Sequence, residues 1–138
     1  MKEANMQSLF KMWLGCNMPK VTTVYELKIE KGKAMLFNRV ADHQIVGLRQ
    51  AKYAGLYYKL PDTLAMGAGM RFNIKKPFDT MVITKAEAYL VVMFYEPKKS
   101  KTCYFIDVDD FIKEKAESPR KSLTEERARE ISSLIKII

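Results

Sequence analysis

The sequence has few of the residues on which disulfide-rich and zinc-binding domains depend. Its 138 residues include one histidine and two cysteines, Cys16 and Cys103, which stand in unrelated contexts and form neither a disulfide framework nor a zinc pattern. No apolar run approaches the roughly 18 residues that cross a bilayer. The first five residues lack the charged-then-apolar pattern of a secretion signal. We therefore expect a reduced, cytoplasmic protein that does not enter membranes.

The chain is also short of acidic residues over most of its length. Residues 1–101 carry 17 Lys/Arg and 8 Asp/Glu, a net charge of +9, whereas residues 102–138 carry 7 and 8, a net charge of −1. A basic surface of this kind attracts polyanions and makes their binding salt-dependent. Charge alone favours a nucleic acid as the partner, although a pI near 9.5 also keeps a protein soluble without one.

Apolar periodicity predicts a single α/β domain. With 48% hydrophobic and 29% charged residues, the composition is that of one folded domain. Ser122 and Glu125 form a capping box for a last helix to Ile138. Residues 1–117 are expected to form a mixed central sheet flanked by helices, and 118–138 a linker and a helix packed on that domain or on a partner. Strands are predicted at 21–29, 55–60, 78–84, 88–95 and 102–108, and helices at 6–14, 42–52 and 109–115.

The motif that most clearly indicates a catalytic or metal-binding site is Glu26-Leu27-Lys28, on the first predicted strand. Alternation places the carboxylate and the ammonium on one face, about 7 Å apart along the chain. A hard cation such as Mg²⁺ prefers carboxylate oxygens, and a neighbouring lysine can activate a water or stabilise charge on a phosphate. Such a pair is most often only a solvated face, but the flanking residues here are apolar and β-forming.

Other candidates for a metal site are scattered along the chain. Asp79 begins an apolar strand and could be a ligand, although an aspartate there more often caps local backbone amides. Glu3, on the first predicted helix, could be a ligand or could simply favour a helix N-terminus. His43 and Gln44 open the second predicted helix, where a lone histidine is more often structural.

Together, these motifs resemble the RecU-type Holliday junction resolvases of the PD-(D/E)XK nuclease superfamily. The similarity rests on the E-x-K strand at 26–28, the following helix that opens with His43-Gln44, the Pro77-Phe78-Asp79 turn, and the closing strands at 88–95 and 104–112. Glu3 matches the helix-borne glutamate of that family. One departure is clear: Asp79 lies 53 residues after Glu26, whereas the family places it before E-x-K. We interpret this as a permuted order of the same parts, with the two acidic strands side by side.

The resemblance implies a restriction-endonuclease-like fold and a Mg²⁺-dependent, structure-selective endodeoxyribonuclease, with Mn²⁺ as a substitute. Glu26 and Asp79 would hold the metal with help from Glu3, Lys28 would activate the attacking water, and Gln44 would support the site. It also implies a homodimer on branched or double-stranded DNA, in a bacterial, phage or mobile-element host cell. The expected phosphate contacts are Lys75, Lys76, Lys98, Lys99 and Lys101.

A non-catalytic nucleic-acid-binding module on the same fold is the alternative. Its support is the basic excess together with Tyr53, Tyr57 and Tyr58, which could stack on bases. We expect these tyrosines instead to be ordinary strand packing. The apolar run Leu134–Ile138 fits packing on the protein's own core and packing on a partner equally well.

Overall fold

The computed structural model describes residue 9, residues 22–59 and residues 79–137. The expected helix at 6–14 is therefore almost entirely outside the described residues. Within them the chain forms a mixed α/β structure, as the sequence predicts. No helix among the described residues is long and apolar enough to span a membrane.

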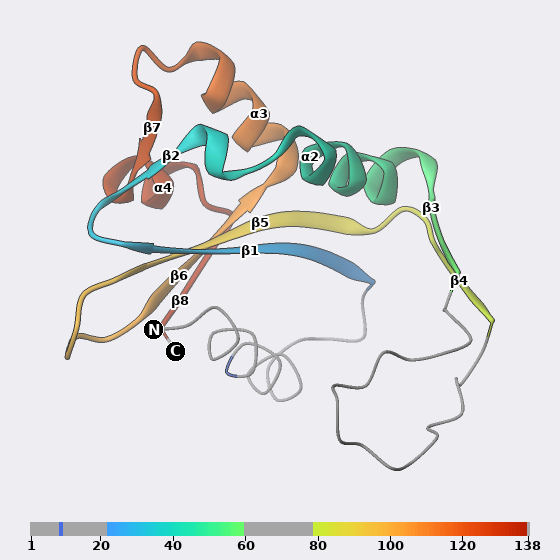
Figure 1. Ribbon diagram of the computed structural model, residues 1–138, viewed down its shortest axis with the longest axis horizontal. Helices are drawn as coiled ribbons and strands as arrows, with labels where there is room; N and C mark the ends of the chain where they lie inside the picture. The colour runs from blue at the N-terminus through green and yellow to red at the C-terminus, as the bar shows by residue number, and fades with distance from the viewer. Residues whose placement is uncertain (1–8, 10–21, 60–78, 138) are drawn as a thin grey trace, which may run out of the picture.

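A four-stranded mixed sheet is the centre of the fold (Figure 1). Its strands are β1 (Thr23–Lys31), β5 (Glu87–Tyr95), β6 (Thr102–Asp107) and β8 (Leu134–Ile137), in the order β1-β5-β6-β8. β1 and β5 are parallel, whereas β5–β6 and β6–β8 are antiparallel. Parallel neighbours need a crossover connection, which here contains α2.

The helices within residues 22–59 and 79–137 lie on one face of this sheet (Figure 1). They are α2 (Asp42–Arg49), which continues into a π-helical segment η2 (Gln50–Ala54), then α3 (Val108–Glu117) and α4 (Glu125–Ile131). Because successive strand residues point to opposite faces, the even-numbered residues of β1 face these helices. Val24, for example, packs beside Leu48 of α2.

The core has one layer on each side of the sheet. On the helix side, Leu90, Val92 and Tyr104 pack against Phe111 of α3. On the other side, Val91, Met93, Cys103 and Phe105 are buried. The continuous apolar run of β5 is thus buried on both faces, as expected for a central strand.

Two short antiparallel ribbons complete the fold. β2 (Ala34–Leu36) pairs with β7 (Ser122–Thr124), next to the 3₁₀ turn η1 (Phe37–Arg39). β3 (Leu56–Lys59) pairs with β4 (Thr80–Ile83), and this ribbon extends beyond the end of the main sheet (Figure 1).

The C-terminal segment differs from the predicted long helix. α4 spans only Glu125–Ile131 and its N-cap is Thr124, whose side chain accepts a hydrogen bond from the Arg127 N–H. Residues Leu134–Ile137 form β8, which pairs with β6. The prediction of a helix to Ile138 was therefore wrong for this run, because strand pairing with β6 overrides a local pattern that suits either structure.

Candidate functional site

The E-x-K pair and Gln44 form one hydrogen-bonded cluster between β1 and α2. Gln44 donates through Nε2 to Glu26 Oε1 at 2.7 Å, and Lys28 Nζ lies 2.9 Å from the same oxygen. The side chains of Glu26 and Lys28 are 24% and 15% exposed. The expected grouping of Glu26, Lys28 and Gln44 is thus present, and the pair is not a freely solvated face.

Local geometry explains how Gln44 reaches Glu26. Gln44 lies in the first turn of α2, where its Oε1 accepts a hydrogen bond from the Ala41 N–H at 3.0 Å. That bond satisfies one of the free N–H groups at the helix start. The side chain is thereby fixed at both ends, with its amide nitrogen directed at β1. The N-cap of α2 is Ala41, and Asp42 is the first residue of the helix.

Only one of the two carboxylate oxygens of Glu26 contacts other described side chains. Both contacts fall on Oε1, and Oε2 has no hydrogen bond or ion pair with any of the described residues. A partly exposed carboxylate oxygen with an uncommitted lone pair is a suitable ligand for Mg²⁺, which proteins often hold through one or two carboxylates plus substrate phosphates. Glu26 therefore fits the role of a cation ligand.

The structure corrects the predicted arrangement around Asp79. The strand that follows Asp79 is β4, which pairs with β3 in a separate ribbon. The neighbour of β1 is β5. The prediction that the strands of Glu26 and Asp79 lie side by side is therefore wrong. The residues of a strand do not by themselves determine which distant strand it pairs with. Nowhere in residues 22–59 and 79–137 do three or more His, Cys, Asp or Glu side chains gather as a metal-binding group.

The remaining predicted site residues fall in two groups. Glu3, Lys75 and Lys76 lie outside the described residues. The loop lysines follow β5: Lys98 and Lys99 are exposed and Lys101 is half-buried. Lys99 forms an ion pair with Glu96 of the same loop, and this interaction raises the pKa of Lys99.

Sequence reasoning missed a second charged pair on the same face of β1. Glu30 lies two residues beyond Lys28, and its Oε2 is 3.6 Å from Nε of Arg39 in η1. The alternation that joined Glu26 to Lys28 also predicts the position of Glu30. No local signal places Arg39 beside it, because η1 reaches β1 only through the folded chain.

A third cluster joins η2 to the start of α3. Lys52 Nζ lies 2.8 Å from a carboxylate oxygen of Asp107 and 2.8 Å from one of Asp109. Burial disfavours the charge on Lys52, but the two carboxylates outweigh it and raise the pKa of the ammonium. Arg49 also approaches Asp109, at 3.8 Å. With acids and bases paired in this way, the cluster explains how α2 is held against α3.

The tyrosines do not pack as expected. The exposed fractions are 62% for Tyr53, 65% for Tyr57 and 53% for Tyr58. The prediction of ordinary strand packing was wrong for these residues. Tyr57 and Tyr58 belong to β3, in a ribbon that lies beyond the main sheet (Figure 1). Tyr53 belongs to η2, and its hydroxyl donates a hydrogen bond to Asp109. Tyr57 and Tyr58 are neighbours in β3 and therefore point to opposite faces of that ribbon.

Comparison with known proteins gives no relative from which to transfer a function. No protein family, no curated protein and no solved structure matches this chain.

Proposed function

We propose that this protein is a metal-dependent, structure-selective endodeoxyribonuclease of the Holliday junction resolvase type, with a restriction-endonuclease-like fold. The observation that carries the proposal is the Glu26 carboxylate. Gln44 and Lys28 hold it through one oxygen, while the other has no hydrogen bond or ion pair with the described part of the chain. The motif resemblance and the basic excess of residues 1–101 add support.

Each member of the cluster has a distinct part in the proposed reaction. Glu26 would hold Mg²⁺, or Mn²⁺ in its place. The cation would stabilise the charge that develops on the cleaved phosphodiester and its leaving oxygen. Lys28 would orient the attacking water and stabilise the negative charge that develops as the proton of that water passes to the solvent. Gln44, by donating to Glu26, is a positioning residue that limits rotation of the carboxylate.

The ion pair between Lys28 and Glu26 is compatible with this proposal. An ammonium 2.9 Å from the carboxylate neutralises a charge that would otherwise be half-buried and unpaired. If a cation takes over the carboxylate, Lys28 is released toward the substrate on the same face of β1. The strand then presents a cation ligand and a lysine side by side.

Nicking of a synthetic four-way DNA junction tests the proposal. Wild type should cut the junction in Mg²⁺ or Mn²⁺, and Lys28→Ala should lose about 10²-fold or more in rate, the range for loss of a general acid–base group. Lys31→Ala is the matched control: it changes an exposed lysine on the same strand but on the opposite face, and should cut at the wild-type rate. Binding of the junction without cleavage in either metal would contradict the proposal.

We also propose that the active form is a homodimer, because resolution of a junction needs two symmetric cuts and a two-fold pair presents two sites to one substrate. Light scattering at micromolar concentration should give twice the 16.0 kDa mass of one chain. A monomeric mass, alone and with junction DNA, would contradict the dimer.

A non-catalytic nucleic-acid-binding role is the second candidate, and the exposed Tyr53, Tyr57 and Tyr58 favour it. Exposed aromatic rings stack on unpaired bases with little sequence preference, at about 1–3 kcal/mol per base. Under this alternative, Tyr57→Ala would weaken binding of single-stranded DNA while Lys28→Ala would leave it unchanged.

A further inference from the structure

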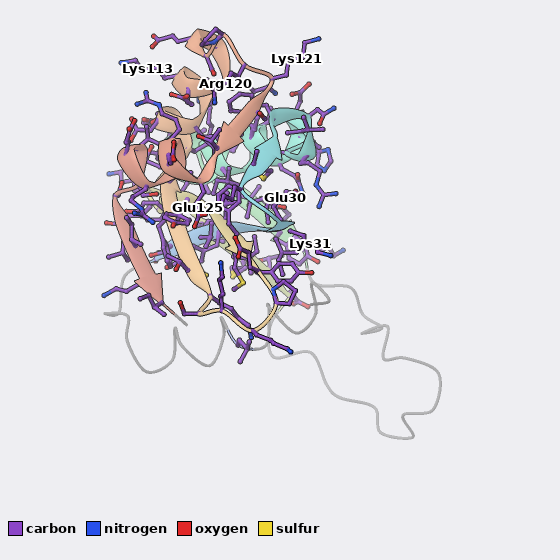
Figure 2. All side chains as sticks on the ribbon, turned by 90° about the vertical axis from the view of Figure 1, so that its left-hand side faces the viewer. Glu30, Lys31, Lys113, Arg120, Lys121 and Glu125 are labelled. Atoms are coloured by element: carbon purple, nitrogen blue, oxygen red, sulfur yellow. The ribbon has the colours of Figure 1, made fainter. Side chains whose placement is uncertain are left out.

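Glu30 and Arg39 extend the charged row of β1 beyond the E-x-K pair. Because strand residues alternate, Glu30 shares the helix-side face with Glu26 and Lys28. It lies near the end of β1 (Figure 2). A strand rises about 3.3 Å per residue, so the Cα of Glu30 lies roughly 13 Å along the strand from that of Glu26. Arg39 reaches Glu30 from η1, the turn just before α2.

The pairing between these two residues is incomplete. Nε of Arg39 is 3.6 Å from Glu30 Oε2, beyond hydrogen-bond range. That oxygen is shielded from solvent and still has no hydrogen-bond partner among the residues that the structure describes. The Arg39 side chain is 55% exposed, and Glu30 is its only ionic partner within residues 22–59 and 79–137. Arg39 therefore carries most of its five N–H donors unused at the surface.

Those donors suit one chemical class of ligand. A guanidinium presents a planar fork that binds two oxygens of a phosphate at once. Each DNA strand carries a phosphate for every 3.4 Å of helix axis. A backbone that enters at Glu26 and runs along β1 would thus present a phosphate to Arg39 only a few nucleotides away.

Glu30 is a competitor for the same guanidinium. The two carboxylates and two cations of the row, Glu26, Lys28, Glu30 and Arg39, cancel in charge, so the row as it stands has no net attraction for an anion. A bidentate phosphate contact is stronger than this loose ion pair, although the exchange leaves the half-buried Glu30 carboxylate unpaired and so costs part of the gain.

We propose that Arg39 binds a DNA phosphate a few nucleotides from the one at Glu26, and leaves Glu30 to do so. The position of that phosphate rests on the proposed nuclease function. The phosphate contact itself rests only on the geometry of Arg39 and Glu30. Arg39 contributes to affinity and register on the DNA, and does not take part in the chemistry of cleavage.

The test compares two arginines in matched settings. Arg49 is 57% exposed and lies 3.8 Å from Asp109, so it resembles Arg39 in exposure and in the looseness of its pair. Binding of a fluorescent four-way junction is measured by anisotropy without divalent metal, over a range of KCl concentrations. Arg39→Gln should weaken binding about five- to tenfold and reduce the slope of log affinity against log salt by about 0.9. Arg49→Gln should change neither, because among the described residues the Arg49 guanidinium, unlike that of Arg39, also lies over an aromatic ring, that of Tyr53.

Two further variants make the result independent of folding and of cleavage. Glu30→Gln removes the competing charge and should tighten binding severalfold, which a merely destabilised protein would not do. Arg39→Lys should restore the salt slope but not the full affinity, because an ammonium cannot form the bidentate contact. An unchanged salt slope for Arg39→Gln, or weaker binding by Glu30→Gln, would overturn the role of Arg39. If wild type binds as described yet cuts no junction in metal, the nuclease proposal fails and the phosphate contact stands.

Discussion

The hydrogen bonds of Gln44 allow a quantitative test of the candidate site. Gln44→Ala removes a neutral bond to the Ala41 N–H and a bond to the charged Glu26. Typical net contributions are about 0.5–1.5 kcal/mol for the first and 1.5–3 kcal/mol for the second. Since the site is only half-buried and water can replace part of each bond, we expect a loss of about 1–3 kcal/mol in the free energy of unfolding.

Gln44→Glu separates the two bonds. Its side chain keeps an oxygen for the Ala41 N–H but presents a second carboxylate to Glu26, so like charges replace the hydrogen bond. At pH 7 this variant should be at least as destabilised as Gln44→Ala. Its penalty should shrink near pH 4, where glutamate side chains are partly protonated.

Urea denaturation followed by circular dichroism gives these free energies. Gln50→Ala is the control, because Gln50 is an exposed glutamine just beyond the same helix and should change stability by less than about 0.5 kcal/mol. Wild-type stability of Gln44→Ala, or a Gln44→Glu penalty that does not change with pH, would refute the link between Gln44 and Glu26.

Three further predictions concern the fold and the basic loop. Gly55 has φ +117°, and a Cβ there would lie 3.1 Å from Thr84 Cγ2, so Gly55→Ala should lower the free energy of unfolding in urea by about 1–3 kcal/mol. Gly47 lies in α2 with open space around it, so Gly47→Ala should raise that free energy by about 0.5–1 kcal/mol. Equal effects of the two substitutions would contradict the backbone conformation of Gly55. Burial raises the pKa of the Cys103 thiol to about 12 from 9.0. The contribution of the buried neutral thiol to the free energy of unfolding is therefore complete below pH 9 and is lost as pH rises toward 12. Between pH 9 and 12, the free energy of unfolding should fall more steeply with pH in wild type than in Cys103→Ala, by up to about 1.4 kcal/mol per pH unit. If the two proteins lose stability with pH at the same rate, Cys103 is not buried in this way. The loop lysines are Lys98, Lys99 and Lys101, and Lys99 is already paired with Glu96. Replacing all three by alanine should therefore lower the slope of log affinity for DNA against log salt by about two rather than three. An unchanged slope would show that the loop is a solvated turn without phosphate contacts.

The sequence predicts those parts of the site that depend on local geometry. Strand alternation alone places Glu26 and Lys28 on one face, and the motif resemblance implies that Gln44 joins them. The same alternation gives the position of Glu30. The contact between Glu26 and Lys28 thus follows from periodicity within one strand.

Contacts set by long-range pairing could not be predicted in this way. Asp79 precedes a strand whose partner is β3, and nothing in residues 78–84 distinguishes β3 from β1 as a neighbour. The run Leu134–Ile137 forms a strand because its backbone pairs with the edge of β6. Both errors arise because pairing partners depend on the whole fold, whereas helix and strand patterns report only on burial.

The central claim is that Glu26 is the cation ligand of a nuclease site. Binding of Mn²⁺ to the protein with uncleavable junction DNA, followed by electron paramagnetic resonance, tests it most directly. Wild type should bind Mn²⁺ in this complex, and Glu26→Gln, which keeps the size of the side chain but removes its charge, should weaken that binding by about tenfold or more. Equal Mn²⁺ affinity in wild type and Glu26→Gln would show that the cation is held elsewhere and would contradict the account.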